Sequence, residues 1–92
     1  MSIHQGGSKY KNMNENKITK KVIAVLARTL EIPVSKVKTD STQKSIESWD
    51  SLAHLKLVME IEKNFNISFN TDEVFSMDSI EEICRLVKKH LA

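Results

Sequence analysis

The spacing of its apolar residues restricts this chain to a helical fold. Near the amino end they stand four apart, at Ile18, Val22, Leu26 and Leu30, which is the repeat of one helix face. This stripe predicts a helix from about residue 16 to residue 31, ended before Pro33 because proline disfavours helix at the preceding residue. A second stripe near the carboxyl end predicts another long helix, and it consists of Ile80, Ile83, Cys84, Val87 and Leu91. Two glycines and one proline in 92 residues argue against a turn-rich β sandwich or barrel.

The middle of the chain predicts one more long helix and a short one. The long helix starts at residues 50–51, ends near residue 64 and is apolar around more than half of its circumference, so it packs against several neighbours or borders a groove. Asn70 and Glu73 have the spacing of a capping box and predict a short third helix through Phe75, and Asp78 with Glu81 repeats that spacing before the last helix. The predicted fold is therefore all-α, with three longer helices and a short third one. One face of the middle helix carries Leu52, Leu55, Val58, Met59 and Phe65, and Leu57 and Ile61 extend the apolar arc beyond it.

A long connection, residues 33–49, separates the first two helices. Val34 and Val37 are its expected anchors in the core, and its polar residues favour turns or a small helix. Residues 1–13 lack apolar periodicity and contain both glycines, so we expect a flexible tail or an expression leader, with the natural start at Met13. The folded domain is therefore predicted to cover residues 14–92.

Charge and composition argue against several classes of protein. The net charge of +2 divides into +6 over residues 1–44, −7 over residues 45–82 and +3 over residues 83–92. An acidic middle repels phosphates, so we expect no nucleic-acid partner, although the basic first part keeps a small DNA-binding domain as an alternative. No apolar run reaches the ~18 residues of a membrane span, and no signal-peptide pattern is present, so a cytoplasmic chain is expected. We also expect a monomer. One cysteine and three scattered histidines predict neither a disulfide nor a metal site.

Asp50 and Ser51, at the start of the middle helix, are the main candidates for a functional site. Both residue types favour helix starts because their side-chain oxygens accept backbone N–H groups, so capping alone would explain them. A serine hydroxyl at this position is also exposed, and the helix N-terminus favours an attached phosphate. Ser51 is therefore either a cap residue or a modification site.

Three nearby or reactive residue types give weaker candidates. His54 shares a helix face with Ser51, but the chain has no nucleophile elbow, orienting acid or Gly-rich oxyanion turn. A serine hydrolase is therefore disfavoured, and His54 is expected to be exposed. Trp49 is predicted to be a packing anchor with a partly exposed edge for partners. Cys84 is predicted to be a small core residue rather than a reactive thiol.

The segment from Glu47 to Phe69, ESWDSLAHLKLVMEIEKNFNISF, closely resembles the acyl carrier protein family. Asp-Ser-Leu at residues 50–52 matches the attachment signature of that family, and the apolar pattern after it matches the family's second helix. The first helix, long loop, acidic third segment and amphipathic last helix also fit, so the resemblance covers about residues 16–91. It implies a four-helix bundle of the acyl-carrier type.

The resemblance also implies a carrier rather than an enzyme. A phosphopantetheinyl transferase would attach 4′-phosphopantetheine from coenzyme A to the Oγ of Ser51, with magnesium that Asp50 helps to position. Leu52 completes the signature. The thiol of the arm would hold an acyl group as a thioester for acyl-loading ligases and for acyl-transfer or synthase enzymes, and tethering would raise its effective concentration.

Departures from the family concern the surface that partners contact. Ala53 and Lys56 stand where many fatty-acid carriers have acids, so we expect a specialised pathway, such as surface polysaccharide or secondary metabolite synthesis. Two alternatives stay open: an aminoacyl or peptidyl carrier that uses Ser51, and an unmodified helical interaction module. Recognition is expected to be largely electrostatic. The residues assigned to partner binding are Trp49, Lys56, Glu60, Glu62, Asp72 and Glu73.

Overall fold

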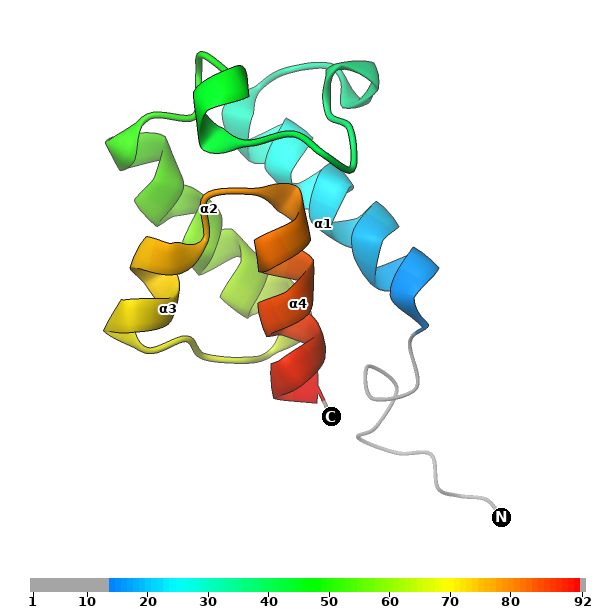
Figure 1. Cartoon of the computed structure of the whole chain (residues 1–92), viewed down its shortest axis with the longest axis vertical. Helices are drawn as coiled ribbons and strands as arrows, with labels where there is room; N and C mark the ends of the chain where they lie inside the picture. The colour runs from blue at the N-terminus through cyan, green and yellow to red at the C-terminus, as the bar shows by residue number, and fades with distance from the viewer. Residues whose placement is uncertain (1–13, 92) are drawn as a thin grey trace.

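Four α-helices make up the part of the chain that the computed structural model describes, residues 14–91 (Figure 1). Their bounds are α1 Glu15–Leu30, α2 Ser51–Phe65, α3 Thr71–Ser76 and α4 Ile80–Leu91. Two short 3-10 helices, Val34–Lys36 and Gln43–Ser45, lie in the connection between α1 and α2. The all-α prediction with a short third helix is confirmed. The tail expected over residues 1–13 lies outside the described residues.

Side-chain caps and left-handed residues fix the ends of the longer helices. The Oδ1 atom of Asn14 accepts the Lys17 N–H at 2.9 Å and starts α1. Glu31 and Asn66 end α1 and α2 with φ of 57° and 56°. This conformation turns the chain out of the helix, and residues other than glycine adopt it at a cost. The expected end of the first helix near residue 31 is therefore correct, but a left-handed residue ends it before Pro33 is reached.

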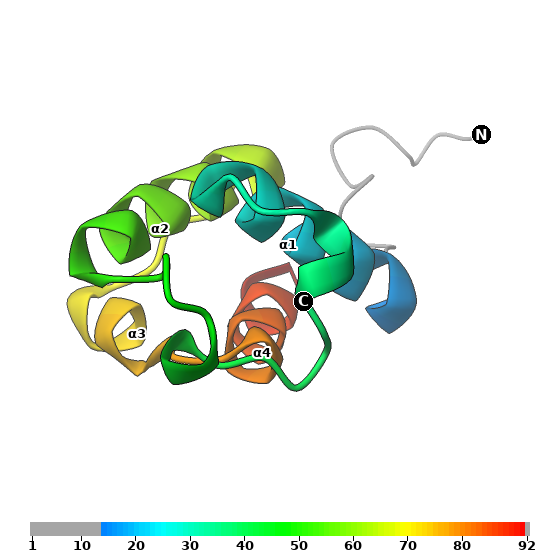
Figure 2. The ribbon, with the colours of Figure 1, turned by 90° about the horizontal axis from the view of Figure 1, so that it is seen from above.

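The core lies between α1, α2 and α4, and α3 sits beside α2 (Figures 1 and 2). Val22 and Leu26 of α1 and Val87 of α4 are fully buried, as the stripes predict. Burying one such side chain contributes about 1.5–3 kcal/mol. The buried apolar stripes hold the bundle together. The start of α2 lies at one end of the bundle, next to the connection between α1 and α2.

The neighbouring helices cover only part of the broad apolar surface of α2. Leu52, Leu55 and Met59, three residues of the apolar face seen in the sequence, are 78%, 53% and 66% exposed. Because α2 is apolar around more than half of its surface, periodicity alone does not show which side the neighbouring helices cover. The buried residues of α2 are His54, Leu57, Val58, Ile61 and Phe65.

The connection between α1 and α2 is attached to the corner between α3 and α4. The Gln43 N–H donates to the Asp78 carbonyl at 2.8 Å, and the Ile80 N–H donates to the Ser41 carbonyl at 3.0 Å. Val37 is buried as expected, whereas Val34 is 57% exposed, so that expectation is wrong. Ile46 supplies the second buried anchor of the connection instead.

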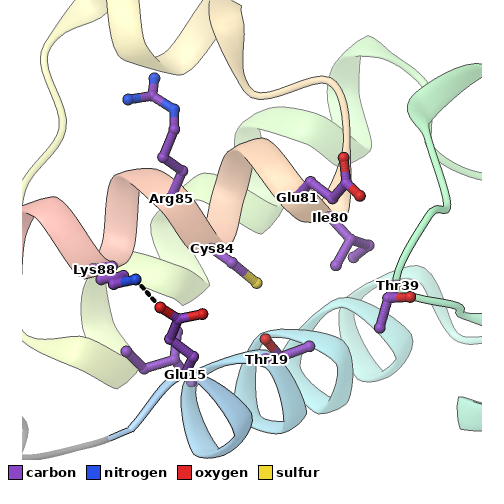
Figure 3. A pocket seen from close by; sticks show the side chains of 9 residues that line it. Glu15, Thr19, Thr39, Ile80, Glu81, Cys84, Arg85 and Lys88 are labelled. Carbon is purple, nitrogen blue, oxygen red and sulfur yellow. Dashed lines mark hydrogen bonds and ion pairs between the residues drawn. The ribbon is translucent and has the colours of Figure 1, made fainter.

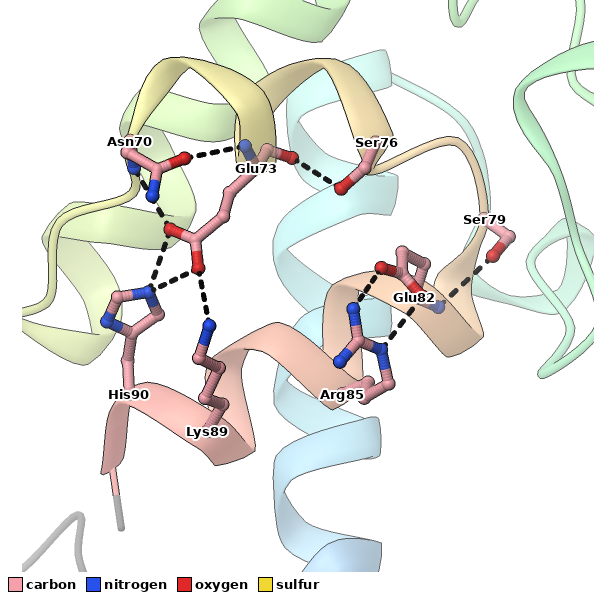
Figure 4. Close-up of polar contacts among 8 residues, drawn as sticks. All are labelled: Asn70, Glu73, Ser76, Ser79, Glu82, Arg85, Lys89 and His90. Atoms are coloured by element: carbon pink, nitrogen blue, oxygen red, sulfur yellow. Dashed lines mark hydrogen bonds and ion pairs between the residues drawn. The ribbon is translucent and has the colours of Figure 1, made fainter.

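Side-chain caps fix the starts of α3 and α4 (Figure 4). Asn70 and Glu73 form the predicted capping box, with side chain to backbone distances of 2.8 and 3.0 Å. The cap expected from Asp78 and Glu81 is wrong by one residue. Ser79, directly before α4, accepts the Glu82 N–H at 3.1 Å through its Oγ.

Candidate functional site

Ser51 is the first residue of α2, and its side chain is exposed. Asp50 precedes it in an extended conformation and caps the helix, because its Oδ1 accepts the Ala53 N–H at 2.8 Å. The Asp50 carbonyl accepts the His54 N–H, also at 2.8 Å, which begins the helical hydrogen bonding. The hydroxyl therefore stands in solvent at the positive end of α2, where a phosphate is favoured.

The surroundings of Ser51 fit a large flexible group on its hydroxyl. Leu52 beside it is 78% exposed, so neither neighbour covers the attachment point. Asp50 uses one carboxylate oxygen for the cap, and the other takes no hydrogen bond from the described residues. The cap and an exposed hydroxyl thus coexist, and the capping role of Asp50 leaves Ser51 open for modification.

His54 is buried, at 8% exposure, and the expectation of an exposed histidine is wrong. Its Nδ1 lies 3.0 Å from the Trp49 Nε1, and its Nε2 lies 2.7 Å from the Val74 carbonyl of α3. Sequence reasoning missed this contact, although His54 precedes Leu57 and Val58 by three and four residues and so continues the stripe that is buried. Trp49 is 2% exposed, so it is a packing anchor as predicted, but it offers partners no exposed edge.

The charged residues assigned to partner binding occupy different environments. Lys56 and Asp72 are exposed. Glu60 lies 3.9 Å from the Arg28 guanidinium, in an ion pair with α1. Glu62 accepts the Phe69 N–H at 2.8 Å and so holds the connector between α2 and α3. The four acids expected to attract partners therefore do not form one solvated face.

Glu73 is a structural residue, and the expectation that it meets partners is wrong because it is 8% exposed. Its carboxylate accepts the Asn70 N–H and lies 3.0 Å from the His90 Nε2 and 3.4 Å from the Lys89 Nζ (Figure 4). The backbone bond from Asn70, followed by the contact with His90, lowers its pKa from 4.5 to about 2. The ionised carboxylate thus joins α3 to the last turn of α4.

A cavity of about 220 Å³ lies between α1 and α4, and Cys84 lines it together with Thr19 (Figure 3). An ion pair between Glu15 and Lys88 borders this cavity. Cys84 is half-buried against the core, and burial raises the pKa of its thiol. It therefore stays protonated at neutral pH and is a poor nucleophile.

Within residues 14–91, no group of three His, Cys, Asp or Glu side chains is placed to hold a metal ion. None of the helices described is both long and apolar enough to cross a membrane.

Comparison with known proteins identifies the class of site. The family described as "Phosphopantetheine attachment site" matches residues 20–87, which include Ser51 and most of the bundle. A domain of this family carries 4′-phosphopantetheine as a covalent group.

Similar proteins from three organisms show which kind of phosphopantetheine-carrying protein this chain resembles. The acyl carrier protein of Akkermansia muciniphila is 32% identical over 79 residues, covering 84% of this chain and 96% of the relative. Acyl carrier proteins of Guillardia theta and Buchnera aphidicola are 29% and 28% identical, covering 87% and 80% of this chain and 99% and 95% of those relatives. The chain belongs to the acyl carrier protein family, whose members carry intermediates and are not enzymes.

Proposed function

We propose that 4′-phosphopantetheine is attached to the Oγ of Ser51. The exposed hydroxyl at the start of α2, inside the matched region, is the observation that carries this proposal. Asp50, Ser51 and Leu52 also have the sequence of the attachment signature. When bound, the group supplies a terminal thiol that holds an acyl chain as a thioester. Cys84 is protonated and half-buried, so the chain itself offers no competing thiolate.

Asp50 has two roles in this proposal. One carboxylate oxygen caps α2, at 2.8 Å from the Ala53 nitrogen. The second oxygen is available to the magnesium ion of the transferase reaction, since carboxylates are preferred magnesium ligands. The residue thus fixes the turn before Ser51 and presents a negative charge next to the hydroxyl.

A docking strip on α2 lies next to Ser51, and we define it as Leu52, Leu55 and Met59. These residues are exposed and follow one another at intervals of three and four, so they lie on one side of the helix. Exposed apolar side chains in a row are typical of protein contact sites. Lys56 is exposed on the same helix and adds a positive charge. We propose that transferase, acyl-loading ligase and synthase enzymes contact this strip.

The cargo proposed for the arm is an acyl group, because the relatives are acyl carrier proteins. The proposed setting is a cytoplasmic monomer in a specialised pathway. Lys56 supports this setting, since many fatty-acid carriers have an acid at that position. Incubating the modified protein with candidate ligases and reading the attached mass distinguishes acyl from aminoacyl cargo, and loading of amino acids alone would contradict the acyl proposal.

Coexpression with a broad-specificity phosphopantetheinyl transferase tests the attachment. The intact mass is expected to rise by one phosphopantetheine group, and Ser51→Ala is expected to abolish the rise. Ser48→Ala is the matched control, because Ser48 is exposed just before the helix and is expected to leave modification unchanged. An unmodified wild type, or a modified Ser51→Ala variant, would refute the proposal and favour an interaction module.

A further inference from the structure

A hydrogen-bonded pair of buried side chains flanks, in the sequence, the residue proposed for attachment. Trp49 and His54 are five residues apart, and Ser51 lies between them in the chain. The Trp49 Nε1 is 3.0 Å from the His54 Nδ1, with ring centroids 6.1 Å apart and planes inclined by 24°. Both side chains are buried while Ser51 is exposed. The contact therefore joins the residue before the Asp50 cap to the first turn of α2 on the buried side of the helix.

Donor and acceptor chemistry allows one arrangement of this contact. An indole N–H donates and never accepts, so the His54 Nδ1 must accept. The imidazole then carries its proton on Nε2, which donates to the Val74 carbonyl at 2.7 Å. That carbonyl is in the last turn of α3, where carbonyls lack partners within the helix. His54 thus has two separate contacts, one with the turn and one with α3.

We propose that Trp49 and His54 are positioning residues for the modification of Ser51. In the transferase reaction the Ser51 Oγ bonds to the pantetheine phosphorus of coenzyme A, and the phosphoanhydride bond breaks. Adenosine 3′,5′-bisphosphate leaves, and the hydroxyl proton passes to a base of the transferase. This inference rests on the proposed function. Attack requires a fixed direction for the hydroxyl, and a misplacement of about 1 Å can slow such a step about a hundredfold.

The pair holds the backbone from which the Ser51 hydroxyl projects. The Trp49 N–H donates to the Ile46 carbonyl at 3.0 Å, and the His54 N–H donates to the Asp50 carbonyl at 2.8 Å. The side-chain bond between Trp49 and His54 ties these two fixed points together. Ser51 is held between them, and its own side chain makes no hydrogen bond with the described residues.

Two substitutions of His54 separate the two contacts. The Oδ1 of asparagine stands the same number of bonds from the backbone as the histidine Nδ1, so His54→Asn keeps an acceptor for Trp49 and loses the Val74 contact. The Nε2 of glutamine corresponds to the histidine Nε2, so His54→Gln keeps the Val74 contact and loses the acceptor. Trp49→Phe removes the donor and keeps a buried ring. Val87→Ala, in the α4 core, is the control for destabilisation alone.

The experiment measures kcat and KM for modification of each apo variant at a temperature where circular dichroism shows it folded. We expect His54→Gln and Trp49→Phe to lower kcat about tenfold or more with KM within about twofold, because the docking strip is untouched. His54→Asn and Val87→Ala are expected to stay near the wild-type kcat. The double variant Trp49→Phe/His54→Gln is expected to be no slower than the slower single variant, because both remove one bond.

The inference fails if the variants that break the Trp49–His54 bond keep the wild-type kcat, or if His54→Asn is as slow as His54→Gln. It also fails if Val87→Ala loses as much kcat as they do. These outcomes differ from failure of the proposed function, in which the wild type is never modified or Ser51→Ala still gains the group.

Discussion

Substitutions of Asp50 separate its capping role from its proposed role in metal binding. Asp50→Ala removes the acceptor that lies 2.8 Å from the Ala53 nitrogen at the start of α2. Losing such a cap costs about 1 kcal/mol, and losing a negative charge at the helix start costs roughly a further 0.5 kcal/mol. Asp50→Asn keeps an oxygen acceptor, so its loss is expected to be about 0.5 kcal/mol.

Thermal unfolding followed by circular dichroism measures this difference. In a domain of this size 1 kcal/mol shifts Tm by about 4–8 °C. Asp50→Ala is therefore expected to unfold roughly 6–12 °C below the wild type, and Asp50→Asn roughly 2–4 °C below it. A Tm for Asp50→Ala equal to that of the wild type would refute the capping argument.

The modification rate gives the second measurement on the same variants. Both substitutions remove the carboxylate, so both are expected to lower the rate of phosphopantetheine transfer strongly, although Asp50→Asn remains nearly as stable as the wild type. Wild-type transfer by Asp50→Asn would show that the capping oxygen suffices and that the carboxylate binds no metal during transfer.

Three further predictions concern the helix ends, the α3–α4 contact and the docking strip. Glu73 ionises in the folded state with a pKa lowered to about 2, so it stabilises the fold above pH 4.5 and this contribution is lost as the pH falls from 4.5 toward 2. Glu73→Gln is expected to lower Tm at pH 7 and to flatten the fall of Tm over that range; an unchanged pH profile would contradict this assignment. Glu31→Gly removes the steric cost of the left-handed conformation at φ 57°, so the free energy of unfolding measured in urea is expected to rise by about 1 kcal/mol. A decrease would show that the Glu31 side chain contributes more to stability than its backbone conformation costs. Leu55→Ala is expected to raise the transferase KM severalfold with Tm nearly unchanged, and an unchanged KM would place docking elsewhere.

The longer helices could be predicted because their signals are local. The stripes of α1 and α4 each have a single apolar side, so periodicity determines which side is buried. The capping box of Asn70 and Glu73 was also predictable, since it involves residues three apart in the chain. The local sequence around Ser51 predicted only a helix start, and the resemblance of residues 47–69 to the acyl carrier protein family was needed to favour attachment at Ser51.

The remaining errors come from contacts between distant parts of the chain. The carbonyl of Val74 and the indole of Trp49 give His54 two partners in the interior, and one of them lies twenty residues away. Glu73 looks like a solvated acid until α4 brings His90 against it. In α2 both sides are apolar, so the position of α1 and α3, rather than the sequence of α2, decides that Leu55 faces solvent.

The three residues 41–43 run beside residues 78–80, joined by the Gln43–Asp78 and Ile80–Ser41 backbone bonds and by the bridge between Thr42 and Ser79. These backbone hydrogen bonds attach the irregular connection to the bundle. Because they use main-chain groups, most side-chain replacements leave them intact. Sequence drift here should therefore leave the path of the chain unchanged, whereas an inserted residue would break the register. The amide hydrogens of Gln43 and Ile80 should exchange slowly with deuterium and open together, although Gln43 only begins a short 3-10 helix and Ile80 is the first residue of α4.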